Sequence, residues 1–119
     1  MHDEDPIDSF LPLPPLTLHI LLALSDEPRH GYAIIQSVAA STRGKVVLGA
    51  GPLYRSIHRM LEQGLIVETA TRPVPAQDDE RRRYYRITKV GAAVAQAEAG
   101  RLAQLLKLAR ASGFAPGRA

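Results

Sequence analysis

Four polar side chains share one side of a short amphipathic segment near the middle of the sequence. Tyr54, Arg55, His58 and Arg59 lie in GPLYRSIHRMLEQGLI, which spans residues 51–66. Arginine forms paired hydrogen bonds with guanine or charged contacts with phosphate, and a tyrosine hydroxyl donates to phosphate. This combination suits binding to a polyanion such as DNA. A solvated helix face is the alternative interpretation of the same residues.

The spacing of the apolar residues predicts the helix that positions this set. They recur every third or fourth place and are expected in the core: Leu53, Ile57, Met60 and Leu61. Pro52 suits the first helical position, where its missing N–H costs nothing, and Gly64 is expected to end the helix. Gly51 lets the backbone approach a duplex closely at the exposed N–H groups of the helix start.

Two further helices are expected before this one. LTLHILLALSDEP is almost wholly apolar and stops before Pro28, and HGYAIIQSVAASTRG ends near Gly44. In the second of these helices Tyr32 is expected in the core. Arg43 and Lys45, which follow it, are candidate flanking contacts to phosphate.

After Leu65 the apolar period changes to two, which predicts a hairpin. LIVETAT and RYYRIT are expected to pair as antiparallel strands, with one of the adjacent Tyr84 and Tyr85 in the core and the other exposed. The polar segment RPVPAQDDERR between them is expected to project as a wing. Its end carries three arginines that are candidates for phosphate or minor-groove contacts: Arg81, Arg82 and Arg83. Pairing of these arginines with the preceding Asp78, Asp79 and Glu80 is the alternative.

The last predicted helix starts with Thr88 as its N-cap and carries an apolar stripe over about 24 residues. A thin domain cannot cover such a stripe, so we expect a dimer seam, with packing inside one subunit as the alternative. The candidate seam residues are Leu18, Leu22, Leu102, Leu105, Leu106 and Ala109. Two recognition helices about 34 Å apart across a twofold axis reach successive major grooves.

This order of elements predicts a mainly α fold with a small β-hairpin, a winged helix-turn-helix followed by a long C-terminal dimerisation helix. We divide the chain into four parts: a flexible N-terminal arm (1–15), a winged-helix DNA-binding domain (16–88), the dimerisation helix (89–112) and a flexible tail (113–119).

The charge distribution favours an anionic partner. The chain of 119 residues has a net charge of +3, but its first 14 residues hold four of the 12 acidic and none of the 15 basic residues. The remainder therefore carries 15 basic and eight acidic residues, a net charge of +7. A basic body suits a polyanionic partner, although ordinary solubility charge gives the same composition.

Other classes of protein are disfavoured. Cysteine is absent, which excludes disulfides and thiolate metal sites. No apolar run approaches the roughly 20 residues that span a membrane, and the acidic N-terminus is unlike a secretory signal, so we expect a cytoplasmic protein. The four histidines are scattered without metal-ligand spacing, and neither a catalytic triad nor a Gly-rich phosphate loop is evident. We therefore expect no metal, no cofactor and no enzymatic activity.

Three segments resemble PadR-type transcriptional regulators. HGYAIIQSV is similar to the start of that family's second helix, GAGPLYRSIHRMLEQGLI to its recognition helix, and RRRYYRITKVG to its second wing strand. The resemblance runs from Leu16 to Arg110. Pro52 stands where the family usually has threonine, so a hydroxyl that could cap the helix or contact a phosphate is missing.

The resemblance implies a homodimeric repressor that binds an inverted-repeat operator in double-stranded DNA. The single C-terminal helix resembles the short-tailed subfamily. Some relatives bind phenolic acids or flat hydrophobic drugs between subunits, which implies a small aromatic or hydrophobic effector. The alternatives are a winged-helix adaptor that binds a protein with the same face, and a small metal-sensing regulator.

Overall fold

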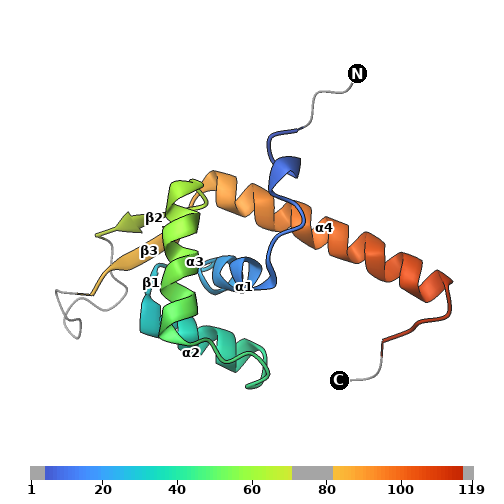
Figure 1. The fold of residues 1–119 in the computed structure, drawn as a ribbon, viewed down its shortest axis with the longest axis horizontal. Helices are drawn as coiled ribbons and strands as arrows, with labels where there is room; N and C mark the ends of the chain where they lie inside the picture. Colours follow the sequence, from blue (N-terminus) through green and yellow to red (C-terminus); the bar gives the residue numbers. More distant parts are fainter. Residues whose placement is uncertain (1–4, 71–81, 117–119) are drawn as a thin grey trace.

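The computed structural model describes residues 5–70 and 82–116, and its helices and strands follow the predicted order (Figure 1). The elements along these residues are the 3-10 helix η1 (Asp8–Phe10), α1 (Pro15–Ala23), β1 (Arg29–His30), α2 (Gly31–Ser41), α3 (Ala50–Glu62), β2 (Ile66–Thr69), β3 (Tyr84–Ile87) and α4 (Lys89–Ala111). The expected fold class, a winged helix-turn-helix with a long C-terminal helix, is confirmed.

The core lies where α1, α2 and α3 meet the sheet and the first half of α4. Its fully buried side chains come from each of these elements: Ile20, Leu21, Leu24, Ile34, Val38, Leu53, Ile57, Met60, Leu65, Ile66 and Val94. The predicted inner face of α3 is confirmed, since Leu61, the fourth expected residue, packs partly buried against this cluster. Removing this apolar surface from water stabilises the fold by roughly 25 cal/mol per Å².

The sheet has three antiparallel strands in the order β1-β3-β2, one more than the expected hairpin. The two-residue β1 pairs with the start of β3, so that Arg29 lies opposite Tyr85 and His30 opposite Tyr84. This pairing corrects the prediction that one of the two tyrosines is exposed. Tyr84 is 8% and Tyr85 4% exposed, because β3 is the central strand and the His30 ring packs edge-on against Tyr84, 5.3 Å between centroids.

The prediction that Tyr32 lies in the core is wrong. The inner positions of α2 are Gly31, Ile34 and Val38, spaced three and four residues apart, so the side chain next to Gly31 points outward and is 59% exposed. The helix starts at its predicted place: His30 is the N-cap, and its Nδ1 accepts a hydrogen bond from the Ala33 N–H at 3.1 Å.

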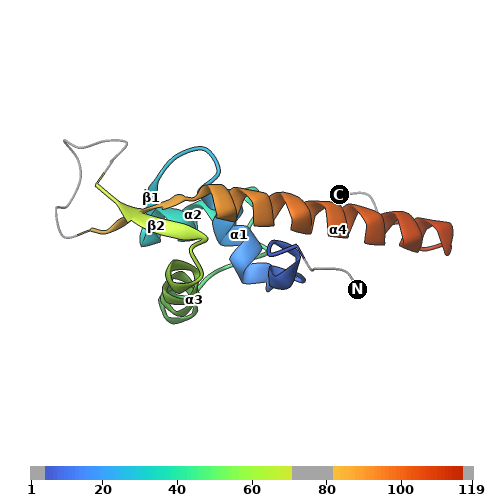
Figure 2. The same ribbon diagram turned by 90° about the horizontal axis from the view of Figure 1, so that it is seen from above.

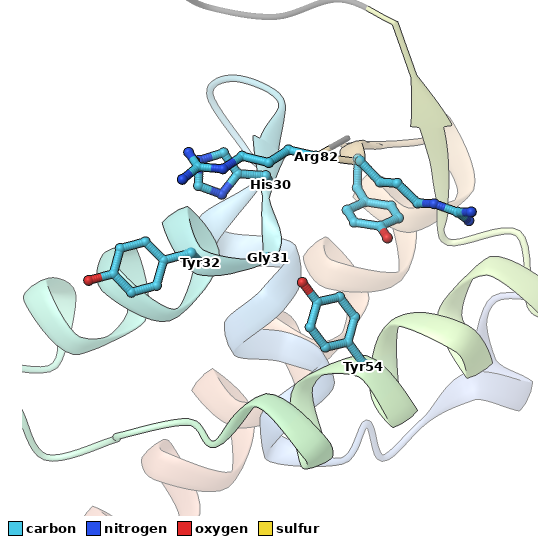
Figure 3. A pocket seen from close by; sticks show the side chains of 7 residues that line it. His30, Gly31, Tyr32, Tyr54 and Arg82 are labelled. Carbon is cyan, nitrogen blue, oxygen red and sulfur yellow. The ribbon is translucent and has the colours of Figure 1, made fainter. Parts of the chain in front are cut away.

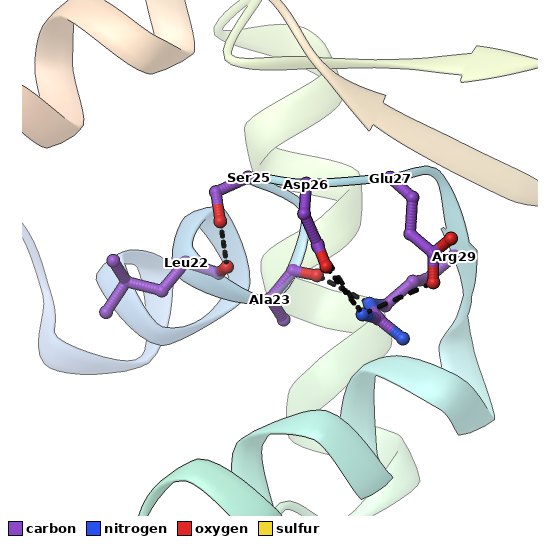
Figure 4. A network of polar contacts seen from close by, with 6 residues as sticks. All are labelled: Leu22, Ala23, Ser25, Asp26, Glu27 and Arg29. Carbon is purple, nitrogen blue, oxygen red and sulfur yellow. Dashed lines mark hydrogen bonds and ion pairs between the residues drawn. The ribbon is translucent and has the colours of Figure 1, made fainter.

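An arginine fixes the turn between α1 and β1. The Nε of Arg29 donates to the carbonyl oxygen of Ala23 at 2.7 Å, which satisfies a free carbonyl at the end of α1 (Figure 4). The same guanidinium lies 3.3 Å from Asp26 and 3.4 Å from Glu27. The cation is therefore committed to holding this turn and is not available to a ligand.

Two close contacts join the end of α3 to the start of α4. Gly64, with φ +75°, ends α3 as predicted, and its N–H and that of Leu65 donate to the carbonyls of Leu61 and Met60. Thr88, the N-cap of α4, donates its hydroxyl to the Gly64 carbonyl at 2.6 Å and accepts from the Gly91 N–H at 3.0 Å. A Cβ at Gly91 would overlap the Leu65 carbonyl, so glycine is required there.

The segment before α1, which we expected to be a flexible arm, lies against the core in its described part. Leu13 is buried, and Ile7, Phe10 and Leu11 pack partly buried beside it. These apolar residues have no helical or strand period, because they belong to a 3-10 turn and a proline-rich extended stretch. Their packing could therefore not be predicted from hydrophobic periodicity.

A buried carboxylate lies on α4 beside this segment. Glu98 is 3% exposed and accepts two hydrogen bonds from Arg101, at 2.6 and 3.0 Å. These bonds, together with the charge of Arg101 and a hydrogen bond from the Leu13 backbone, hold the pKa of Glu98 below its usual range against the opposing effect of burial. The ion pair lies within α4, and the hydrogen bond from the Leu13 backbone joins the Glu98 carboxylate to the N-terminal segment.

Beyond Arg101, α4 leaves the rest of the molecule. Figures 1 and 2 show its C-terminal half extending past the other helices, on the side of the molecule opposite to the hairpin. Nearly every residue from 102 to 111 is exposed.

Candidate nucleic-acid interface

The core contacts of α3 determine which of its side chains face outward. Leu53, Ile57 and Met60 are at most 1% exposed, which fixes the rotation of the helix. At 3.6 residues per turn, Arg55 and Arg59 then lie on the opposite side, and both are exposed together with His58.

These outward residues line one shallow groove of about 490 Å³. Its walls are Gly51, Tyr54, Arg55, His58, Arg59 and Glu62. Within residues 5–70 and 82–116, no hydrogen bond or ion pair involves the side chains of Arg55, His58 or Arg59. The two guanidinium groups of the groove are therefore unpaired among the described residues, and an α-helix with such a face has the dimensions to enter a major groove.

Glu62 is a groove residue that sequence analysis missed. Its carboxylate lies at the C-terminal end of the helix, where it is exposed. A carboxylate accepts hydrogen bonds from the cytosine N4 amino group and repels phosphate. Its position one turn beyond Arg59 was available from the helical period alone.

The start of α3 is also open. The helix begins at Ala50, two residues before the predicted start, and its N-cap Gly49 offers no side chain to the first N–H groups. Pro52 is consequently the third residue, still in the turn where an N–H has no helical partner. A Cβ at Gly51 would lie 3.3 Å from a guanidinium nitrogen of Arg55, which folds back over this end. Exposed N–H groups and a nearby cation favour an anion here.

The turn between α2 and α3 places two further cations at the surface. Arg43 has φ +54°, in the left-handed region, and with Gly44 it ends α2. Thr42 holds the following chain, since its hydroxyl accepts from the Val46 N–H at 3.1 Å. Arg43 and Lys45 are both exposed.

The wing contributes two arginines among the described residues, and Arg81 lies outside them. Arg83 is 3.8 Å from Glu68 of β2, an exposed ion pair of the kind worth about 0–1 kcal/mol. Arg82 extends to His30, with 3.1 Å between its guanidinium and the imidazole Nε2. The expected pairing with residues 78–80 falls outside the described residues.

Comparison with known proteins agrees with this geometry. The sequence matches the transcriptional regulator PadR-like family over residues 20–97, about two thirds of the chain. The chain belongs to the PadR-like family. The family is one of transcriptional regulators that bind DNA, so DNA is a partner of this class of protein and the expectation of a non-enzyme is confirmed.

Solved structures show the same fold. A transcriptional regulator from Clostridium thermocellum is 22% identical, with a TM-score of 0.67 over 92% of this chain and 96% of the other. A PadR family regulator from Eggerthella lenta is 27% identical, with a TM-score of 0.60 over 76% and 73%. A PadR family regulator from Clostridium difficile is 22% identical, with a TM-score of 0.65 over 80% and 94%. No sequence among the curated proteins matches the chain.

Two of the six predicted seam residues, Leu102 and Leu105, lie on the uncovered half of one stripe of α4 in this PadR-like chain. Positions 91, 94, 98, 102, 105 and 109 follow one another at intervals of three or four residues and form a single stripe. Its first half is buried at Gly91, Val94 and Glu98, whereas Leu102 and Leu105 are 40% and 53% exposed.

The remaining seam candidates are distributed differently. Leu106 lies beside the exposed half of the stripe and is exposed, while Ala109 is half-buried. On α1, Leu22 is exposed, but Leu18 is half-buried and packs against the core, so the chain itself already covers part of it.

Two classes of site are not indicated by the described residues. Residues 5–70 and 82–116 contain no group of three or more His, Asp or Glu side chains placed to hold a metal ion. Over the same residues, no helix combines the length and the apolar character needed to cross a membrane.

Proposed function

We propose that this chain is a homodimeric transcriptional repressor that binds an inverted-repeat operator through α3 and the wing. The observation that carries the proposal is the groove on α3, whose Arg55 and Arg59 are exposed and have no partner among the described residues, opposite the buried Leu53, Ile57 and Met60. An α-helix fits the DNA major groove, and unpaired arginines on its outer face can bind a duplex there. They displace counterions from phosphate and form hydrogen bonds with base edges.

The same proposal assigns roles to the flanking residues. Gly51 and Pro52 bring the open start of α3 close to the duplex, and Arg82 and Arg83, together with Arg81, contact phosphate or the narrow minor groove beside it. Tyr54 and His58 contribute hydrogen bonds at the rim of the groove.

Dimerisation is supported by the uncovered half of the α4 stripe. Leu102, Leu105, Leu106 and Ala109 present an apolar face that another copy of α4 would cover, joined by Leu22 from α1. A twofold pair of α3 helices then reads a symmetric site, and occupancy of that site blocks polymerase. A small aromatic or hydrophobic effector between the subunits would change the spacing of the two α3 helices and release the DNA.

Selection of bound sequences from random duplex DNA tests the proposal. We expect a recovered site with two inverted half-sites whose centres are about 10 base pairs, or a multiple of that, apart. Binding to this site should weaken steeply as salt rises, with a slope near −0.9 in log–log form for each phosphate neutralised. Failure to enrich any duplex, or binding that does not respond to salt, would instead favour a protein partner for the α3 face.

A further inference from the structure

A second pocket lies beside the α3 groove, between the start of α2, the middle of α3 and the wing strand (Figure 3). It encloses about 310 Å³ and is lined by His30, Gly31, Tyr32, Tyr54, Arg82, Arg83 and Tyr85. Of these residues, His30, Gly31, Tyr32 and Tyr85 were not among the predicted DNA contacts. None of these seven described lining residues carries a carboxylate.

Tyr85 is the buried polar group of this pocket. The residue is 4% exposed, and its hydroxyl has no hydrogen-bond partner in residues 5–70 and 82–116. Leaving a buried hydroxyl without a partner costs about 1–3 kcal/mol. Burial, followed by the charge of Glu68 and then by Tyr54, raises the pKa of Tyr85, and Arg83 lowers it less. The hydroxyl therefore stays protonated and is a donor that has no acceptor among the described residues.

Tyr54 supplies a second hydroxyl. Its ring packs over Gly31, so closely that a Cβ at that position would overlap the phenol. Figure 3 shows the Tyr54 hydroxyl directed toward the start of α2. This hydroxyl also lacks a hydrogen-bond partner among the described residues. The glycine of the HGY sequence is thus explained by the place it leaves for Tyr54.

The surroundings favour an anion. The 11-residue helix α2 directs its N-terminus, with its partial positive charge, at the pocket, and two guanidinium groups stand at the rim. The ion pair of Arg83 with Glu68 is weak. A neutral imidazole has one acceptor nitrogen, so the contact of Arg82 with His30 competes with the cap that His30 provides to Ala33. An oxyanion would offer both arginines a better acceptor.

We propose that this pocket binds a phosphate group, supplied by the DNA backbone, through the hydroxyls of Tyr85 and Tyr54, the start of α2 and the guanidinium groups of Arg82 and Arg83. The inference rests on the proposed function and adds to it a contact that carries no sequence information. A phosphate held between α2, α3 and the wing strand fixes the register in which α3 enters the major groove.

Tyr85→Phe is the direct test, because it removes one buried hydroxyl and keeps the ring. We expect the affinity of the full chain for a duplex recovered by selection to fall about tenfold, equally for mismatched duplexes, with an unchanged salt slope since no charge is removed. Tyr84→Phe is the matched control: it removes a buried hydroxyl one residue earlier, from a side chain that does not line the pocket, and should leave DNA affinity unchanged. Thermal unfolding of each variant checks that the fold persists.

Duplexes carrying a single neutral methylphosphonate locate the contact. We expect one position in each half-site where the substitution weakens binding of the parent chain but weakens the Tyr85→Phe variant much less, because both changes remove the same hydrogen bond. Equal losses at every position in both proteins would overturn the proposal, as would unaltered DNA affinity of Tyr85→Phe.

Inorganic phosphate distinguishes the source of the anion. If phosphate alone shifts the Tyr85 ring resonances saturably, while Tyr85→Phe binds DNA like the parent, the pocket belongs to a free oxyanion and its assignment to DNA is wrong. If the parent chain binds no duplex at all, the proposed function fails first. If the parent chain binds the duplex and Tyr85→Phe binds it equally well, only the phosphate pocket is wrong, and the proposed function stands.

Discussion

Helices α3 and α4 each bury one face in their own subunit and leave another open, but the open faces differ in chemistry. On α3 the apolar side packs against the core, and the open side presents Arg55 and Arg59, which have no partners among the described residues. On α4 the apolar stripe itself is left open beyond Arg101. An open cationic face suits a polyanion, whereas an open apolar face suits another apolar face. The comparison separates the surface for DNA from the surface for a second copy.

Breaking the α4 face should have the largest effect. In Leu105→Asp, a charge in the middle of the uncovered stripe should yield monomers. Loss of the second α3 should lower operator affinity by about 10²–10⁴-fold, the usual contribution of bivalent binding. Light scattering measures the mass, and fluorescence anisotropy with the selected duplex measures the affinity.

Gln104→Asp is the control for this charge. Position 104 is turned about 100° around the helix from position 105, away from the stripe, and Gln104 is exposed. The control should remain dimeric with parental affinity. A dimeric Leu105→Asp protein would place the seam elsewhere.

Breaking the α3 face should reduce DNA binding without changing the mass of the protein. Arg55→Ala should cost about 1–3 kcal/mol of binding free energy, with relaxed preference at one base pair if the guanidinium reads guanine, or a smaller salt slope if it contacts phosphate. Lys107→Ala removes another exposed cation, on α4, and should change neither quantity. Parental affinity of Arg55→Ala at every salt concentration would remove Arg55 from the interface.

The two helices also differ in how much the sequence could predict. The outward set on α3 was predictable because Leu53, Ile57 and Met60 repeat at the helical period, and that period alone fixes which residues face away. The same reasoning identified the α4 stripe. Periodicity cannot say, however, where along α4 the subunit stops covering it, since this depends on the length of the segment that packs across Glu98.

Features without a period were missed. The two-residue β1 is too short to show alternation, so its pairing with β3 and the burial of both Tyr84 and Tyr85 could not be predicted. Tyr32 was misplaced because it recurs at helical spacing with Ile35 and Val38, whereas the buried face of α2 runs through Gly31, Ile34 and Val38. Gly31 belongs to this face because its missing side chain makes room for Tyr54. Glu98 was missed because its partner is on the same helix and its cover comes from a segment without regular structure.

Replacing each of two glycines of α4 by alanine compares the stability of its buried half with that of its open half. Gly91→Ala should lower the unfolding free energy by about 1–3 kcal/mol, because its Cβ would overlap the Leu65 backbone carbonyl and the start of the helix must shift. Gly100→Ala meets nothing within 4 Å and should raise that free energy by up to about 1 kcal/mol through helix propensity. Urea unfolding measures both. A destabilised Gly100→Ala would show that another surface, such as a second subunit, approaches α4 there.

The smallest expected effect is on stability, at the Glu98–Arg101 ion pair where the buried half of α4 ends. Because the folded pKa of Glu98 lies below its unfolded value, the ionised carboxylate stabilises the fold above the unfolded pKa, about 4.3, and this contribution is lost as pH falls through the lower folded pKa. Glu98→Gln keeps the shape but loses the charge. It should cost about 1–2 kcal/mol near pH 7, and the difference from the parent should shrink as pH falls below about 4.

Unfolding free energies from pH 3 to 7 test this boundary, with Glu62→Gln as the control for an exposed glutamate that has no ion pair among the described residues. The control should follow the parent at each pH. If Glu98→Gln does so as well, the ion pair with Arg101 contributes nothing to stability. The N-terminal segment would then be held on α4 by its apolar contacts alone, since Leu13 would stay buried whether or not Glu98 is charged.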